Sequence, residues 1–260
     1  MKIIFKFILI FTVIIISFIS YLSLVGLETN KFNNQISNKI KKINSNLEIE
    51  LKEIKIILDP FKFKFHAKTI GSKIKNKNKF IEIESIKAQI PLKSLINQKF
   101  LVENLEVSTK TLEIKNLISF IRVFNKKPEL YILEKFIKKG FLIADIKFSF
   151  DAEGNLKNDY KVNGFVKDVN MNFFQIYKLD KLNFIFNYSS NTLSVQNFDL
   201  LFNDLKLSSN DLSLKKVKED ILIEGDIKNE ILKINDKNIQ LFIKSYLPGL
   251  NINNLKFSSK

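Results

Sequence analysis

The sequence predicts a mostly β protein: an N-terminal transmembrane helix followed by a twisted antiparallel β-sheet, as an open β-groove or a sandwich, with a few short helices. A long uncharged apolar stretch near the N-terminus predicts the helix. Beyond residue 47, apolar and polar residues alternate with a period of two, so each strand has one apolar and one polar face, as in antiparallel sheets. With 260 residues, 45% of them hydrophobic, the chain can form one large domain or two small ones.

The apolar stretch from Phe7 to Leu27 contains no charged residue. At a helical rise of about 1.5 Å per residue it covers roughly 31 Å, the thickness of a bilayer's hydrocarbon core. A cleaved signal peptide is the alternative, but its apolar region is normally only about 7–15 residues long, and residues 23–26 make a poor cleavage site. We therefore expect residues 1–27 to be a cytoplasmic tip and a retained membrane anchor.

The charges beside this anchor bear on its orientation. Lys2 and Lys6 favour a cytoplasmic N-terminus, although several lysines also follow the span. Because the positive-inside rule weakens for a long translocated domain, we expect the bulk of the chain to lie outside the cytoplasm.

Residues 28–46 are predicted to form an amphipathic helix. Its apolar positions are spaced four, four and three residues apart, which is one stripe of a helix: Phe32, Ile36, Ile40 and Ile43. One interpretation places this helix on anionic headgroups beside the anchor. The other, which we favour because a single surface helix usually packs on its own domain, has it cover one end of the following sheet.

Residues 47–260 are expected to form the β-rich domain. The alternating apolar positions that define its strands are Leu47/Ile49/Leu51, Phe61/Phe63/Phe65, Ile81/Ile83, Ile86/Ala88/Ile90, Ile146/Phe148/Phe150, Tyr160/Val162/Gly164/Val166, Leu182/Phe184/Phe186/Tyr188 and Ile221/Ile223/Gly225/Ile227. The alternation slips by one residue near Ser85, which predicts a β-bulge.

A helical insertion is expected at about residues 117–139. It consists of two short helices separated by Pro128, and Gly140 is placed to cap the second in the left-handed conformation. Near the end of the chain, residues 241–246 suggest another short helix and residues 251–257 a further strand.

The composition excludes most familiar catalytic sites. There is no cysteine, so thiolate metal sites and cysteine nucleophiles are excluded, and His66 is the single histidine, so a metal site of several histidines is excluded as well. The best carboxylate group is Asp145, Asp151 and Glu153, but the sequence 151–155 is typical of an ordinary hairpin turn. We expect no cofactor, no metal site and no enzymatic activity.

The net charge of +15 does not indicate nucleic-acid binding. Nearly all of it comes from lysine, and Arg122 is the single arginine. Proteins that bind nucleic acids favour arginine for bidentate contacts to guanine and phosphate. The lysines also alternate with apolar residues and form no basic tract, so we expect no nucleic-acid partner.

The most prominent feature of this sequence is its predicted apolar sheet faces, and the chain has 25 phenylalanines. Such faces can bury against a second sheet as a core, the usual outcome. They can also line an open gutter that holds acyl chains. Residue periodicity alone leaves both alternatives open and favours the closed core.

Residues 80–115 resemble the N-terminal module of AsmA-like proteins, a family that includes the TamB and YhdP relatives. The resemblance rests on a strand, a Pro-Leu-x-x-Leu turn of helix, a second strand and a short third strand, with matching positions at Ile86, Ala88, Pro91, Leu92, Leu95, Val102, Leu105, Val107, Leu112 and Ile114. The order of membrane helix, amphipathic helix and strands is also similar to that family. Residues 140–229 resemble its β-repeat region.

The resemblance implies a single-pass protein of the bacterial inner membrane, with a periplasmic β-groove like that of chorein-type lipid carriers. It implies lipid transfer or outer-membrane assembly without catalysis, with membrane lipids, phospholipid above all, and envelope proteins as partners. The chain is short for that family. On the predicted strands, the candidate groove residues are Phe148, Phe150, Val162, Phe184 and Phe186.

Two further hypotheses remain beside this one. The first is a membrane-tethered scaffold with a closed β-core and no lipid cargo. The second is a smaller carrier domain like LptC, which the helical insertion at 117–139 fits poorly.

Overall fold

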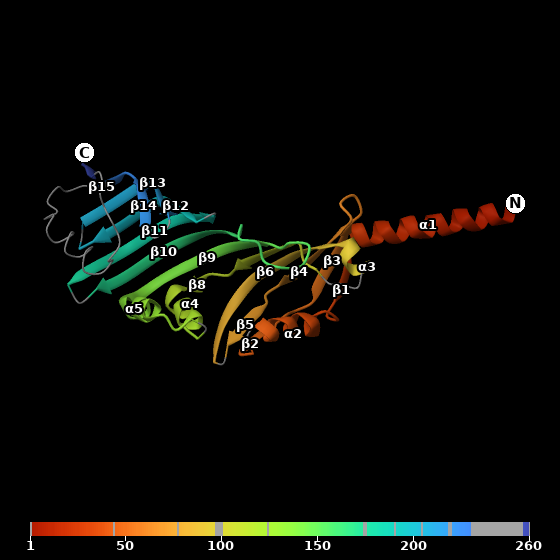
Figure 1. Cartoon of the computed structure of the whole chain (residues 1–260), viewed down its shortest axis with the longest axis horizontal. Coiled ribbons are helices and arrows are strands. Elements are labelled where there is room, and N and C mark those ends of the chain that lie inside the picture. The colour runs from red at the N-terminus through yellow and green to blue at the C-terminus, as the bar shows by residue number, and fades with distance from the viewer. Residues whose placement is uncertain are drawn as a thin grey trace. The chain divides into compact units, whose positions relative to one another are not determined.

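The computed structural model describes residues 2–43, 45–76, 78–96, 101–123, 125–173, 176–189, 191–203, 205–217, 220–229 and 257–259. The described chain is mostly β, with antiparallel strands, an N-terminal apolar helix and a few short helices (Figure 1). This confirms the predicted fold class. The chain divides into two compact units: unit 1 comprises Met1–Thr109 and Lys147–Asn158, and unit 2 comprises Lys110–Ile146 and Asp159–Lys260.

Unit 1 contains the N-terminal helix, two shorter helices and mostly short strands. Its elements are α1 (Lys2–Leu24), β1 (Leu27–Thr29), α2 (Asn33–Ile43), β2 (Leu47–Glu50), β3 (Ile54–Asp59), β4 (Lys64–Ile70), β5 (Lys73–Asn76), β6 (Lys79–Pro91), α3 (Leu92–Ile96) and β7 (Asn104–Thr109).

Unit 2 contains most of the long strands and two helices. Its elements are β8 (Leu112–Glu113), α4 (Ile114–Ile121), α5 (Pro128–Phe136), β9 (Ile137–Ser149, of which the part from Lys147 belongs to unit 1), β10 (Lys161–Phe173), β11 (Tyr177–Ser189), β12 (Thr192–Phe202), β13 (Leu205–Val217), β14 (Asp220–Gly225), β15 (Ile227–Asn229) and β16 (Phe257–Ser259).

Helix α1 is long and apolar enough to cross a membrane. The suitable stretch is Ile3–Leu24, with a mean hydropathy of 2.7, and none of its most apolar window is buried inside the protein. The helix begins before Phe7 and ends before Leu27, so both predicted limits differ from the observed ones. Leu27 instead pairs with Ile56 as the first residue of β1.

Gly26 makes the sharp change from α1 to β1. Its φ of +79° lies in the left-handed region, and a Cβ there would stand 2.5 Å from the carbonyl oxygen of Ile56. Only glycine combines this backbone conformation with so close an approach. The chain therefore passes from the apolar helix into the sheet within two residues.

The amphipathic helix is shorter than the predicted 28–46. Residues 27–29 form β1, and α2 covers Asn33–Ile43. The Asn33 side chain donates hydrogen bonds to the carbonyls of Leu51 and Lys52, at 3.3 and 3.2 Å. Lys41 pairs with Glu48 of β2 at 3.7 Å. These contacts favour the interpretation in which the helix packs on its own domain.

The unit 1 sheet has the order β1-β3-β4-β6-β7, and β5 and β2 continue from the first half of β6. The bulge predicted near Ser85 is confirmed as a register shift between Ile83 and Ser85 in the β6–β7 pair. The predicted strand through Phe61, Phe63 and Phe65 is wrong in its first half. Phe61 and Phe63 lie in the β3–β4 turn, because β4 begins only at Lys64.

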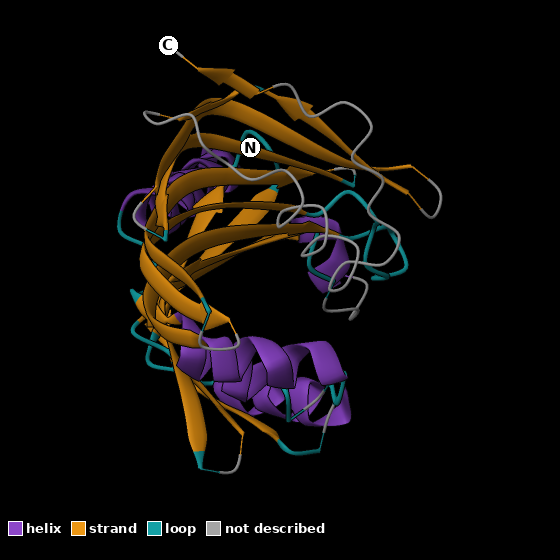
Figure 2. Cartoon of the chain, turned by 90° about the vertical axis from the view of Figure 1, so that its left-hand side faces the viewer, coloured by secondary structure: helices purple, strands orange, loops and turns teal. Residues whose placement is uncertain are grey.

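In unit 2 the strands follow one another as neighbours from β9 to β13 and pair antiparallel from β10 on, with β14 and β15 both paired to β13. β15 and β16 form a parallel pair. The described strands of unit 2 belong to one sheet, and its first and last strands do not pair, so the sheet is not closed there. In the view that faces unit 2, this sheet is curved, with helices on its concave side (Figure 2).

The helical insertion lies slightly earlier than predicted, as α4 and α5. The predicted cap at Gly140 is wrong: α5 ends at Phe136, and Ile137 already has extended backbone angles. Gly140 lies within β9, where a Cβ would meet the Val169 side chain at 2.8 Å. Tertiary packing against β10 therefore replaces the local capping signal. The helix expected at 241–246 and most of the strand expected at 251–257 lie outside the described residues.

Candidate functional site

One face of the unit 2 sheet is apolar across several strands, and we call it the apolar face of unit 2. The strand register places in successive rows Val162, Tyr188, Leu193, Leu214 and Ile223, then Gly164, Phe186, Val195 and Leu212, then Val166 and Phe184. Val166, Val195 and Leu212 are buried, and the other side chains are half-buried. The face offers neighbouring aromatic and aliphatic side chains, which is the lining that apolar ligands require.

The two phenylalanines of β11 are the largest members of this face. The rings of Phe184 and Phe186 meet edge to face, with centroids 6.1 Å apart. Phe186 lies across β10 at Gly164, where a Cβ would stand 2.5 Å from the ring. A residue with a side chain at position 164 would push this ring away from the sheet.

Helices α4 and α5 cover one end of the apolar face. Ile118 of α4 forms a buried cluster with Ile137, Val166, Val169 and Met171. Leu130 and Phe136, from α5, pack against the same cluster, and so do Phe184 and Phe186. This end of the face is an ordinary hydrophobic core, and the two phenylalanines stand at its margin.

The opposite face of the same sheet is polar. Asn163, Asn187, Ser194 and Ser213 form one row across four strands. The Asn187 side-chain amide donates to Asn163 Oδ1 at 2.5 Å. Apolar side chains also occur on this polar face, among them Phe165 and its cross-strand partner Ile185, which are 38% and 42% exposed.

The five predicted groove residues divide between the two units. Val162, Phe184 and Phe186 lie together on the apolar face of unit 2. Phe148 and Phe150 belong to unit 1, where both are half-buried. Phe150 forms an isolated bridge with Leu156, and its N–H donates to the Glu103 carbonyl at 2.9 Å.

Sequence reasoning missed the continuation of this face on β12 and β13. Leu193 and Val195 alternate with Ser194, and Leu212 and Leu214 alternate with Ser213. This is the same period of two that identified the earlier strands, so the signal was present in the sequence.

The unit 1 sheet has two different faces as well. Its apolar row is Leu27, Ile56, Ala67, Ala88 and Leu105, and its charged row is Glu28, Lys55, Lys68, Lys87 and Glu106. The charged row borders an open depression of about 630 Å³ lined by Glu28, Lys52, Glu53, Lys55, Lys68 and Ile70. The depression is open to solvent, and side chains of both charges line it.

Asp151, one of the three carboxylates singled out in the sequence, stabilises its own turn. Asp151 Oδ1 accepts the backbone N–H groups of Glu153 and Asn155, at 3.0 and 2.8 Å, and Oδ2 accepts the Asn155 amide at 3.1 Å. The hydrogen bonds from Asn155, first of all from its backbone, hold the pKa of Asp151 below its ordinary value. Among the described residues, no group of three His, Asp or Glu side chains is arranged to hold a metal ion.

Comparison with family models, with curated proteins and with solved structures found no match for this chain. The element order of the predicted resemblance is present as β6, α3, β7 and β8. Membership in the AsmA-like family stays a prediction, because this element order rests on hydrophobic patterns without a catalytic or binding signature.

Proposed function

We propose that this protein is a non-catalytic lipid-binding protein of the bacterial inner membrane. α1 anchors it, and the bulk of the chain lies in the periplasm. In this proposal the apolar face of unit 2 receives acyl chains of membrane lipids, phospholipid first, and takes part in lipid transfer or outer-membrane assembly. Phe184 and Phe186 are the residues that we expect to contact the acyl chains.

The observation that carries the proposal is the extent of the apolar face beyond its helical cover. α4 and α5 pack against β9, β10 and part of β11. The rows of apolar residues continue through β12 and β13 to Ile223 of β14. Leu193, Leu214 and Ile223 in these rows are half-buried, and covering their remaining apolar area with an apolar partner contributes about 25 cal/mol for each Å² removed from water.

A second candidate is a membrane-tethered scaffold that binds a protein and carries no lipid. The buried cluster around Ile118 and Val166 favours it, because this part of the face is already a closed core. The two candidates differ in what touches Phe184.

Photocrosslinking from neighbouring residues distinguishes them. p-Benzoylphenylalanine is placed at Phe184 in one full-length protein and at Ile185 in another, and each protein is irradiated in membranes containing radiolabelled phospholipid. Phe184 and Ile185 lie side by side on β11, on opposite faces of the sheet. We expect a lipid adduct from position 184 and none from position 185.

Any one of four results would count against the proposal. Absence of a lipid adduct at 184 rejects acyl-chain binding there, and protein adducts at that position favour the scaffold. Equal lipid adducts at both positions indicate non-specific contact with the bilayer. A Phe184→Asp protein that folds normally and transfers phospholipid between vesicles as well as Ile185→Asp does would also reject the assignment.

A further inference from the structure

The turn between β3 and β4 exposes two large aromatic side chains. Phe61 is 93% exposed and Phe63 is 68% exposed. A single exposed apolar residue is ordinary on a protein surface. Two phenylalanines on one short turn gain nothing from the core of unit 1, and they point to an apolar environment outside the protein.

The backbone of this turn is held in place. Asp59 Oδ1 accepts the N–H of Lys62 at 3.1 Å, and the carbonyl of Phe63 accepts the N–H of Leu92 at 2.8 Å. Phe63 adopts a φ of +51°, an unfavourable conformation for a bulky residue that persists only where its surroundings impose it. The fold therefore fixes the turn in a conformation that keeps both rings in the open.

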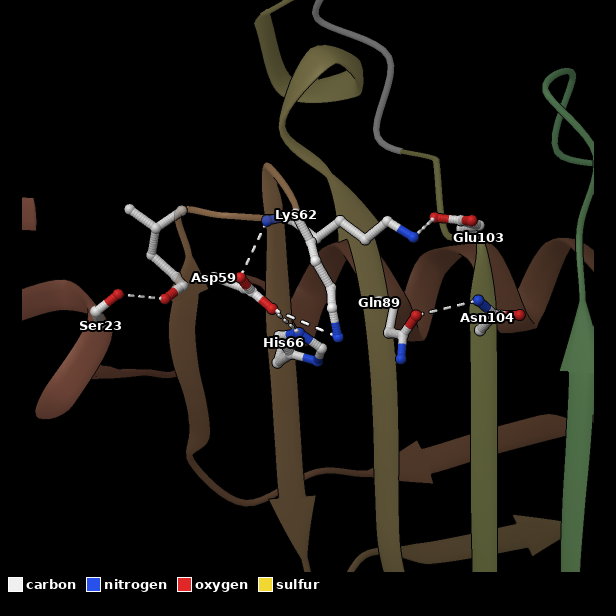
Figure 3. A network of polar contacts seen from close by, with 9 residues as sticks. Ser23, Asp59, Lys62, His66, Gln89, Glu103 and Asn104 are labelled. Carbon is white, nitrogen blue, oxygen red and sulfur yellow. Dashed lines mark hydrogen bonds and ion pairs between the residues drawn. The ribbon is translucent and has the colours of Figure 1, made fainter.

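The same turn is attached to the end of the apolar helix. Ser23, in the last turn of α1, donates a hydrogen bond from Oγ to the carbonyl of Leu58 at 2.7 Å (Figure 3). Leu24 and Val25, beside Ser23, are 83% and 52% exposed. If Ile3–Leu24 crosses the bilayer, Ser23 lies at one boundary of the hydrocarbon core, and the β3–β4 turn lies at the same level.

We propose that residues 59–63 form a second membrane contact, which inserts Phe61 and Phe63 at the headgroup–acyl boundary of the leaflet from which α1 emerges. Lys62 stands between the two aromatic residues, with its side chain 72% exposed, and would meet the lipid phosphates. Aromatic side chains beside a cation are the composition that binds this interface. The contact would fix how unit 1 stands on the membrane. It requires only that α1 spans the bilayer, and it does not depend on lipid binding by unit 2.

The absence of tryptophan from the chain allows a direct test. Full-length Phe61→Trp protein is reconstituted into vesicles of phosphatidylethanolamine and phosphatidylglycerol, with and without bromine on the acyl chains. The matched control is Phe80→Trp, because Phe80 is also an exposed phenylalanine, at 55%, in unit 1. Phe80 lies near the start of β6. The other end of β6, at Pro91, pairs with Lys64 beside the turn. The two ends of this strand are roughly 36 Å apart, so Phe80 lies far from the turn.

We expect the Phe61→Trp emission to be blue-shifted and to be quenched by brominated lipid, while the Phe80→Trp emission is neither. Water-like emission from both proteins would overturn the proposal. Blue-shifted emission from Phe61→Trp without bromine quenching would overturn it too, since the turn would then be buried against protein. Unchanged circular dichroism of each variant shows that the fold is retained.

Discussion

Units 1 and 2 each contain a sheet with one apolar and one polar face, but the residues on these faces differ. One apolar row of unit 1 runs through Ala67 and Ala88, next to a row with Phe65 and Ile90, whereas the apolar rows of unit 2 contain Phe184 and Phe186 and are partly covered by two helices. The polar row of unit 1 consists of Lys and Glu, whereas a central row of unit 2 consists of Asn and Ser.

The difference shows where each unit obtains its stability. Large apolar side chains bury more area per residue than alanine does, so the unit 2 sheet depends on its cluster around Val166 and Val169. Unit 1 also buries apolar side chains, among them Ile54, Ile83 and Ile90, and adds ion pairs such as Lys64–Glu103 at 2.7 Å. Exposed ion pairs contribute little each. We therefore expect a single core substitution to have the largest effect, and to have it in unit 2.

The first prediction concerns Val169→Asp, which places a carboxylate in the unit 2 cluster, where Val169 is 3% exposed. Burying an unpaired polar group costs at least about 2 kcal/mol. We expect hydrogen exchange, followed by mass spectrometry, to show lost protection in β10, β11 and β12 and retained protection in β3, β4 and β6. Phe165→Asp, on the opposite face of β10, is the control and should leave protection unchanged. Lost protection in both units would mean that the two units unfold cooperatively.

The second prediction concerns charge in unit 1 and has a stabilising sign. Lys55 and Lys68 stand directly opposite each other, and Lys87 follows in the same row. Like charges placed directly opposite are unfavourable, so Lys68→Glu would make the row alternate in sign and gain about 0.2–1 kcal/mol. Thermal unfolding in low salt should show a higher midpoint, and added salt should remove most of the gain.

Lys64→Glu is the matched comparison for this substitution. It lies on the same face of β4 but breaks the pair with Glu103. Its midpoint should fall while that of Lys68→Glu rises. If both substitutions lower the midpoint, the lysine row has a role in the folded state that cross-strand repulsion does not describe.

The third prediction, with the smallest expected effect, concerns how low pH affects the turns of the two units. In unit 1, Asp59 accepts the Lys62 N–H and Asp151 accepts the N–H groups of its own turn. In unit 2, the corresponding acceptors at irregular strand positions are amides: Asn183 accepts the N–H of Asp168, Asn170 that of Lys181 and Asn203 that of Lys178. Amides do not titrate in this range, so acid should loosen the turns of unit 1 and leave these sites of unit 2 intact.

The direction follows from the lowered pKa values of Asp59 and Asp151, whose hydrogen bonds from backbone N–H groups favour the carboxylate form. For a carboxyl group whose pKa is lowered by folding, the stabilisation is complete above the unfolded pKa of 3.8 and is lost as the pH falls through the lower folded value. Hydrogen exchange corrected for its intrinsic pH dependence should show opening at residues 59–63 and 151–155 below that pH. Equal opening at Asn183 would contradict this account.

The sequence by itself determined the class of elements and their faces. An uncharged apolar run predicted α1, and a period of two predicted the strands, because side chains alternate across a sheet whatever the strand pairs with. The bulge near Ser85 was also predictable, since a slip in that alternation is a local property of one strand.

Only the tertiary structure decided the boundaries and which apolar residues come together. At Gly26 the chain turns away from the helix, where its backbone lies close to the Ile56 carbonyl. Gly140 lies in a strand, where the Val169 side chain packs on it. Neither partner is near in sequence. The same holds for Phe61 and Phe63, which alternate like strand residues yet lie in a turn held by Leu92. Long-range contacts overrode the local pattern there. They also placed Val162, Phe184 and Phe186 in unit 2 and Phe148 and Phe150 in unit 1.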